Sequence, residues 1–281
     1  MTAQVTTLPR TQVPGVTLVD VTPEVATRWL EANTHNRRLS PDLVSQYARD
    51  MATGHWTFTG DPIKFAHDGT VLDGQHRLHA VVRAEKTVRL LVVNDLAVEA
   101  QKDMDKGRKR QVADTLRLDG VKNSNLVAAA ARVAMLVEMD RQPTTRTSKG
   151  TSFSHNEVLD FIEAHPGLHD AAAAAMHYQP KIDLRPAVIA CAWWYCSRVS
   201  SVATEEFFES IATLATTGKG DPRAALIQRL ASARRNSEQL SAHTQLSMVL
   251  RVWNAWRKGQ QMGRVQVENR SGEPFPVPVA R

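Results

Sequence analysis

Residues 67–80 read H-D-G-T-V-L-D-G-Q-H-R-L-H-A, a stretch that contains both a hairpin signal and a helix start. His67-Asp68-Gly69 lies between two short apolar runs, residues 62–66 and 70–72, which is typical of a β-hairpin. Gly74 then comes directly before a helical pattern of apolar residues. A strand pair that leads straight into a helix predicts a small α/β unit around this point.

The flanking sequence extends this unit in both directions. Residues 16–21 alternate between apolar and polar as a strand does, and residues 88–93 form a second, more apolar strand. Thr22-Pro23 and Ser40-Pro41 each place a hydroxyl N-cap before a proline, which is typical of a helix start. The pattern therefore predicts two helices between the first strand and the hairpin.

Beyond residue 96 the apolar spacing is helical almost to the end of the chain. The predicted fold class is α+β, with a small N-terminal α/β domain followed by a mostly α-helical C-terminal region. We expect a flexible leader (residues 1–15), the α/β domain (16–96), a helical extension (97–140), a polar linker (141–151), a helical domain (152–262) and a C-terminal tail (263–281).

The composition is typical of a globular cytoplasmic protein. Of the 281 residues, 42% are hydrophobic and 23% are charged, and no apolar run reaches the length that spans a membrane. Two cysteines, Cys191 and Cys196, are too few for a disulfide framework. The net charge of +6 permits contact with nucleic acid or with nucleotide phosphates. We therefore expect a cytoplasmic protein without a membrane partner.

Basic residues are concentrated in two stretches. Between Arg223 and Arg264 eight Lys and Arg residues accompany a single acid, Glu238, and residues 106–110 read K-G-R-K-R. Such stretches are either solvated helix faces or nucleic-acid surfaces, and both interpretations stay open. If the stretches bind DNA, the expected contacts are Arg108, Lys109, Arg110, Arg234, Arg235, Arg257 and Lys258.

The helix start after Gly74 has the chemistry of an anion site. A helix N-terminus offers backbone N–H groups and a partial positive charge, and glycine lets a phosphate approach the backbone. His76 and Arg77 add donors, and Gln75 can hydrogen-bond but is not a nucleophile. The residues predict a phosphate cradle. The alternative is an ordinary D-G turn with His76 and Arg77 on a solvated face.

The pattern P-I-x-F…D-G-x-x-L-D-G-Q-H-R-L-x-A, preceded by N-R-x-L-S…Y-A-x-D-M-x-x-G-x-W, resembles the ParB/sulfiredoxin-like superfamily. Residues 74–80 are similar to the G-E-R-R-x-R-A box of ParB nucleotide-binding domains. They also resemble the G-C-H-R loop of sulfiredoxin and the D-G-H-H-R loop of free-serine kinases. The likeness is greatest to uncharacterised ParB-like proteins of phages and actinobacteria, and it covers residues 16–95.

The resemblance implies a site for the phosphates of ATP or CTP. Asp73 is implied to hold Mg²⁺ or to act as a base, and Asp105, followed by Gly107 and Arg110, is the second catalytic candidate. Gln75 stands where sulfiredoxin has its reactive cysteine, which excludes sulfinic-acid reduction. The implied nucleotide-binding residues are Arg37, Lys64, Gly74, Gln75, His76 and Arg77.

Three functions remain open from the sequence. In the first, the chain is a nucleotide-dependent DNA-binding regulator, and this is the function that we expect. In the second, it is an ATP-dependent phosphotransferase or NTP hydrolase, for example a kinase that acts on a nucleotide or a modified DNA base. In the third, the cradle holds only a structural anion. ParB-like proteins often dimerise, so the resemblance also suggests a homodimer.

Overall fold

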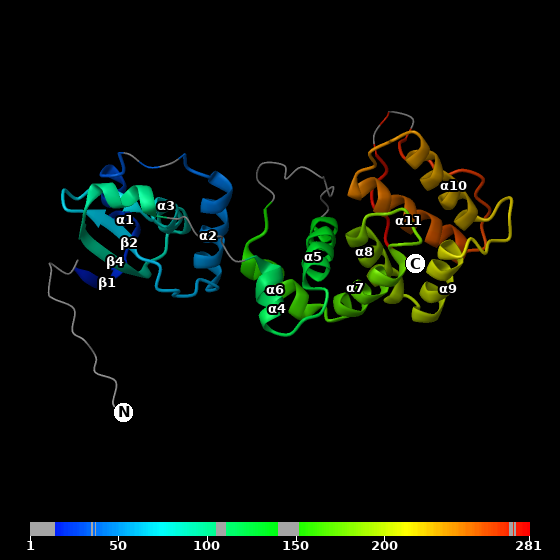
Figure 1. The fold of residues 1–281 in the computed structure, drawn as a ribbon, viewed down its shortest axis with the longest axis horizontal. Coiled ribbons are helices and arrows are strands. Elements are labelled where there is room, and N and C mark those ends of the chain that lie inside the picture. Colours follow the sequence, from blue (N-terminus) through cyan, green and yellow to red (C-terminus); the bar gives the residue numbers. More distant parts are fainter. Residues whose placement is uncertain are drawn as a thin grey trace, which may run out of the picture. The chain divides into compact units, whose positions relative to one another are not determined.

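The computed structural model describes residues 15–34, 36, 38–104, 111–139, 152–269, 272 and 274–281. The chain divides into two compact units (Figure 1). Unit 1 comprises Met1–Lys109 with Lys149–Ser154, and unit 2 comprises Arg110–Ser148 with His155–Arg281. Unit 1 contains a small sheet with helices and the described part of unit 2 is helical, so the predicted α+β fold class is confirmed.

The unit boundaries differ from the predicted domain boundaries at two places. The predicted helical extension is divided, because residues 97–109 belong to unit 1 and residues 110–140 belong to unit 2. Residues 152–154 fall in unit 1, where Ser154 Oγ donates a 2.7 Å hydrogen bond to Asp50 and Gln46 Nε2 donates one of 2.6 Å to Ser152 Oγ. These contacts are long-range, so local sequence patterns do not reveal them. The predicted linker and leader lie largely outside the described residues.

The sheet of unit 1 has four strands in the order β1-β4-β2-β3. The strands are β1 (Val16–Val21), β2 (Ile63–Ala66), β3 (Val71–Asp73) and β4 (Val88–Leu96). Strand β1 pairs antiparallel with β4, β2 pairs antiparallel with β3, and β2 pairs parallel with β4. The predicted hairpin is confirmed: Gly69 N–H donates to Ala66 O at 3.0 Å, and Ala66 N–H donates to Thr70 O at 2.8 Å.

The helices of unit 1 begin where the sequence predicts. They are α1 (Pro23–Glu31), α2 (Pro41–Thr53), α3 (Gln75–Ala84) and a 3₁₀ helix, η1 (Val98–Asp103). Thr22 Oγ1 accepts from Val25 N–H and Ser40 Oγ accepts from Leu43 N–H, so both predicted N-caps are confirmed. Each cap satisfies a backbone N–H that has no partner within its own helix.

One face of the sheet packs into the hydrophobic core, and the opposite face carries Lys64 and Asp73. One face, which includes Val21, Ile63 and Val92, packs with α1, α2 and α3 in the hydrophobic core of the unit (Figure 1). Lys64 pairs in register with Asp73 of β3 and with Val93 of β4, so these side chains share the opposite face. The charged residues near the helix start therefore lie outside the core.

Unit 2 is built from helices around a large aromatic and aliphatic core, in which Trp253, Phe207 and Leu168 are fully buried. Residues Phe275–Arg281 run beside the last helix, where His243 Nε2 donates to Phe275 O at 2.7 Å. No helix in the part of the chain that the structure describes is long and apolar enough to cross a membrane. The helices are α4 (Val112–Leu118), α5 (Ser124–Glu138), α6 (His155–Ala164), α7 (Gly167–Tyr178), α8 (Pro186–Ser197), α9 (Ser201–Ala212), α10 (Pro222–Arg235) and α11 (Ala242–Arg257).

Candidate functional site

Gly74 is the N-cap of α3 and has a left-handed backbone, with φ of 104°. A Cβ atom at this position would overlap the Ile63 side chain and lie 3.2 Å from Ile63 Cα. Only glycine combines this φ value with so close an approach to β2. The space beside Gly74 was expected to hold a phosphate, but on the Cβ side the structure fills it with Ile63. Gly74 therefore allows the start of α3 to pack closely against β2 of the sheet.

Two cationic side chains converge on one carboxylate beside this helix start. Lys64 Nζ lies 3.0 Å from Asp73 Oδ2, and Arg77 Nη2 lies 3.7 Å from the same oxygen. Arg77 also donates to the backbone carbonyls of Asp61 and Pro62, the second at 3.0 Å. No side chain caps α3, and its first turn contains no acidic residue. The three side chains carry a net charge of +1 next to the positive end of a helix dipole.

His76 is buried and links two helix starts. Its Nε2 atom accepts a 3.0 Å hydrogen bond from the backbone N–H of Ser40, the N-cap of α2. That nitrogen therefore carries no proton, and its lone pair accepts a hydrogen bond from within unit 1. Because His76 lies in the first turn of α3, the N-terminal ends of α2 and α3 meet at this bond, and both dipoles favour negative charge nearby.

A chain of side-chain amides borders the site. Asn33 Nδ2 donates to Gln75 Oε1 at 3.2 Å, and Gln101 Nε2 donates to Asn36 Oδ1 at 3.1 Å. Asn36 also donates to the backbone oxygen of Val71 at 2.6 Å. These bonds join the loop between α1 and α2, β3, η1 and the first turn of α3. The network orients Gln75, the residue at the centre of the D-G-Q-H-R motif.

The structure brings six of the predicted site residues together: Lys64, Asp73, Gly74, Gln75, His76 and Arg77. Arg37, Asp105, Arg108, Lys109 and Arg110 lie outside the described residues. The hydrogen-bonding roles of Asn33, Ser40 and Gln101 were not predicted from the sequence. Asn33 is 42 positions from Gln75 and Ser40 is 36 positions from His76, so no local pattern links them.

Asp73 was also predicted to hold Mg²⁺. In the described ranges, no group of three or more His, Cys, Asp or Glu side chains could hold a metal ion. Mg²⁺ is usually bound by one or two carboxylates together with substrate phosphates. Asp73 Oδ2 contacts both Lys64 and Arg77, so a magnesium ion held by Asp73 would need further ligands, such as nucleotide phosphates.

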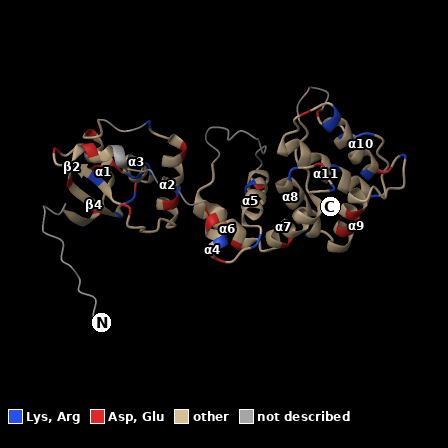
Figure 2. Ribbon diagram, in the orientation of Figure 1, with Lys and Arg blue, Asp and Glu red and all other residues tan. Residues whose placement is uncertain are grey.

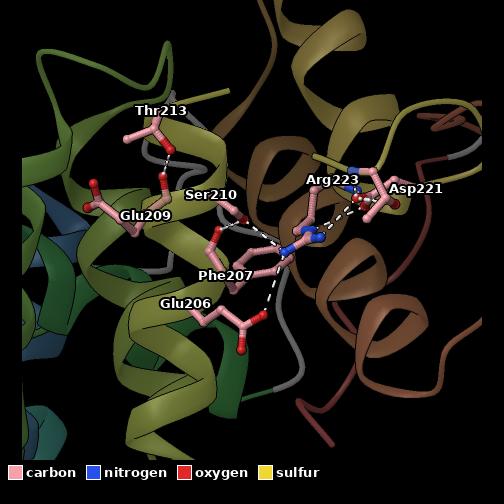
Figure 3. Close-up of polar contacts among 8 residues, drawn as sticks. Glu206, Phe207, Glu209, Ser210, Thr213, Asp221 and Arg223 are labelled. Atoms are coloured by element: carbon pink, nitrogen blue, oxygen red, sulfur yellow. Dashed lines mark hydrogen bonds and ion pairs between the residues drawn. The ribbon is translucent and has the colours of Figure 1, made fainter. Parts of the chain in front are cut away.

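Figure 2 colours the basic residues of unit 2 blue, and they fall into two sets: some make contacts within the fold and others are exposed. Arg223 is buried beside Asp221, with Nη2 2.9 Å from Asp221 Oδ2, and it also contacts α9 (Figure 3). Arg229 Nη2 lies 2.6 Å from Glu238, and the guanidinium of Arg251 lies 3.9 Å from the Phe275 ring centroid. These three arginines make contacts within the fold, and none of them is among the residues predicted to contact DNA.

The residues predicted to contact DNA in unit 2 are exposed but form two separate groups. Arg234 and Arg235 lie in the last turn of α10. Arg257 and Lys258 lie at the end of α11, where the guanidinium of Arg257 is 5.6 Å from the Trp253 ring centroid. Met262 N–H donates to Gly220 O, so the end of α11 lies near the start of α10. The 14-residue α10 therefore separates the groups by about 20 Å.

No protein-family model, no curated protein and no solved structure matches this chain. Function is therefore inferred from geometry and charge.

Proposed function

We propose that this protein binds the phosphates of ATP or CTP at the start of α3 and contacts DNA through the basic ends of α10 and α11. In this proposal nucleotide binding regulates the association with DNA. The observation that supports nucleotide binding is that Lys64 and Arg77 both contact the single carboxylate of Asp73. These residues lie beside a helix start that has no side-chain cap. A phosphate matches this arrangement because it can accept from both cations and from helix N-terminal N–H groups.

The geometry favours binding over phosphoryl transfer. Lys64 and Arg77 have no second carboxylate partner in the part of the chain that is described, so a nucleotide phosphate can compete with Asp73 for them. In this arrangement Asp73 Oδ2 is paired with Lys64 and Arg77, so the carboxylate serves to hold the two cations. Mg²⁺ that accompanies the nucleotide would contact chiefly phosphate oxygens, with Asp73 as its available protein ligand. We therefore favour a nucleotide-dependent switch over a kinase or an NTP hydrolase as the function of this protein.

Replacing Lys64 with methionine is expected to weaken binding of ATP or CTP about five- to tenfold, because one charge-assisted hydrogen bond to phosphate is removed. Lys64 is partly exposed, so removal of its pair with Asp73 affects stability little. Isothermal titration calorimetry in the presence of Mg²⁺ measures the change.

The matched control is Arg83→Met, which removes the same charge from the last turn of α3. Arg83 is exposed and donates to Ser45 Oγ at 2.7 Å, away from the helix start. Nucleotide affinity of this variant is expected to equal that of the wild type. Equal weakening in both variants, or wild-type protein that binds neither nucleotide, would show that the start of α3 is not the site.

The double substitution Arg234→Ala/Arg235→Ala is expected to weaken binding to duplex DNA for all sequences. Each cation that no longer neutralises a phosphate lowers the slope of log affinity against log salt by about 0.9, so the two substitutions together lower it by about 1.8. Fluorescence anisotropy over a salt series measures this slope.

Arg198→Ala serves as the control for the DNA experiment. Arg198 is an exposed arginine of unit 2 that follows α8 and lies 3.8 Å from Glu138. The salt slope should be unchanged in this variant. DNA affinity that is the same with and without nucleotide would contradict the regulatory part of the proposal.

A further inference from the structure

A shallow pocket of about 490 Å³ lies in unit 2, on a surface that the proposed nucleotide and DNA contacts do not use. Residues from three helices line it: α7, α8 and α9. One wall is aromatic and the other is acidic. The lining residues that matter below are His177, Tyr178, Trp193, Glu205, Glu206 and Glu209.

The acidic wall is a set of three exposed glutamates within about one turn of α9. Glu206 lies 3.9 Å from Arg223 Nη1, and Figure 3 shows its side chain directed toward that arginine. Arg223 is already hydrogen-bonded to Asp221 at the shorter distances of 2.9 and 3.1 Å. Glu205 has no ion pair in the described part of the chain. The wall therefore keeps a net negative charge.

One cation lies near the Glu209 end of the acidic wall. Glu209 Oε2 lies 3.9 Å from His177 Nε2. The same nitrogen lies 3.2 Å from the ammonium of Lys181, which can only donate. Lys181 therefore places one positive charge near Glu209, against the three negative charges of the glutamates.

The aromatic wall contains a polar group without a partner. Tyr178 is only 7% exposed, and its hydroxyl makes no hydrogen bond with any residue that the structure describes. Burial raises the pKa of Tyr178, and the negative charges of Glu209 and Glu205 raise it further. Trp193 is half-buried, and its ring contacts no aromatic or cationic group among the described residues.

We propose that this pocket binds a linear aliphatic polyamine. Its ammonium groups contact the carboxylates of α9 and donate to the Tyr178 hydroxyl, and its methylene chain lies on Trp193. Ammonium groups gain from both carboxylates and aromatic faces. Glu205 and Glu209 are separated by one helical turn, about 6 Å, a distance that the methylene chain between two ammonium groups also spans. A single ammonium leaves most of the wall unpaired, so a polyamine fits better than a monoamine.

The test is calorimetric titration of spermidine into the full-length chain, freed of nucleic acid, at physiological ionic strength. Saturable one-to-one binding is expected. The double substitution Glu205→Gln/Glu209→Gln should weaken the affinity about tenfold. Trp193→Leu should weaken it about two- to fivefold, because the substitution removes the cation–π interaction while an apolar surface is kept.

The control variant is Glu163→Gln/Asp119→Asn, which removes two exposed negative charges elsewhere in unit 2. Its affinity for spermidine should stay within about twofold of the wild type. Equal weakening in the control and the pocket variant would mean that spermidine acts as a general counterion, and absence of saturable binding would also overturn the proposal. Butylamine or a peptide with one lysine that binds as tightly as spermidine would overturn the polyamine assignment.

Discussion

Replacing Asp221 with alanine is expected to destabilise unit 2 by about 3–5 kcal/mol, because the substitution leaves the buried guanidinium of Arg223 without its carboxylate. The Asp221 side chain is 2% exposed and that of Arg223 is 9% exposed. Two side-chain bonds join them (Figure 3). Asp221 also accepts from the backbone N–H groups of Thr217 and Arg223. Removal of this N-cap of α10 adds to the cost of the unpaired charge.

Hydrogen exchange on peptides from α9, α10 and α11 of the full chain measures this effect locally. The matched variant is Asp221→Ala/Arg223→Met, which removes both charges and leaves an unbranched side chain beside the Trp256 ring, over which the Arg223 guanidinium lies at 5.0 Å. We expect the double variant to recover much of the stability, since no unpaired charge stays buried. If the double variant is as unstable as Asp221→Ala, the cost does not come from the buried arginine.

The same pair determines the pH dependence of the effect. Burial raises the pKa of Asp221, but hydrogen bonds from Arg223 and from the Thr217 backbone outweigh it and hold the pKa well below the usual 3.8. A carboxylate with a lowered pKa stabilises the fold above its unfolded-state value and loses that contribution as the pH falls toward its folded-state value. The stability difference between wild type and Asp221→Ala should therefore be constant near neutral pH and shrink below about pH 4.

Replacing Gly74 with alanine is expected to destabilise unit 1 by about 2–5 kcal/mol. The left-handed backbone accounts for about 1–2 kcal/mol, and the overlap of the new Cβ with Ile63 accounts for about 1–3 kcal/mol. Ile63 is fully buried in β2 and has little freedom to move away. Hydrogen exchange of α3 peptides in the full chain measures the change.

Gly69→Ala separates the two contributions. Gly69 has a φ of 85°, and a Cβ at that position would meet no atom within 4 Å. This variant should therefore show only the backbone part of the destabilisation, about 1–2 kcal/mol. Ile63→Val in the Gly74→Ala background removes the methyl group that overlaps and should restore part of the stability. The contact with Ile63 is unimportant if Gly69→Ala and Gly74→Ala are destabilised by the same amount.

The elements around the proposed site were predictable because their signals are local. Thr22 and Ser40 cap helices by bonding to N–H groups three residues ahead, and the turn at Asp68-Gly69 closes with bonds between near neighbours. Such interactions depend on residues adjacent in the chain, so a sequence pattern carries them. The same holds for the grouping of residues 73–77, which lie within one hairpin–helix junction.

The properties of the side chains at that junction were not predictable in the same way. His76 was expected to face a phosphate, whereas its Nε2 accepts from Ser40. The space beside Gly74 is filled by Ile63, from a strand earlier in the chain. Arg223 has the same sequence signature as Arg234, yet one is buried in an ion pair and the other is exposed.

The sequence by itself therefore determined the helix caps and the hairpin around the proposed site, the α+β class, and the cluster of polar residues at the start of α3. Only the tertiary structure decided which of those residues are used internally and that Lys64 and Arg77 share one carboxylate. The physical reason is the separation along the chain between the residues that interact. Caps and turns are interactions between neighbours, whereas burial and charge pairing depend on residues that the fold brings together from distant positions.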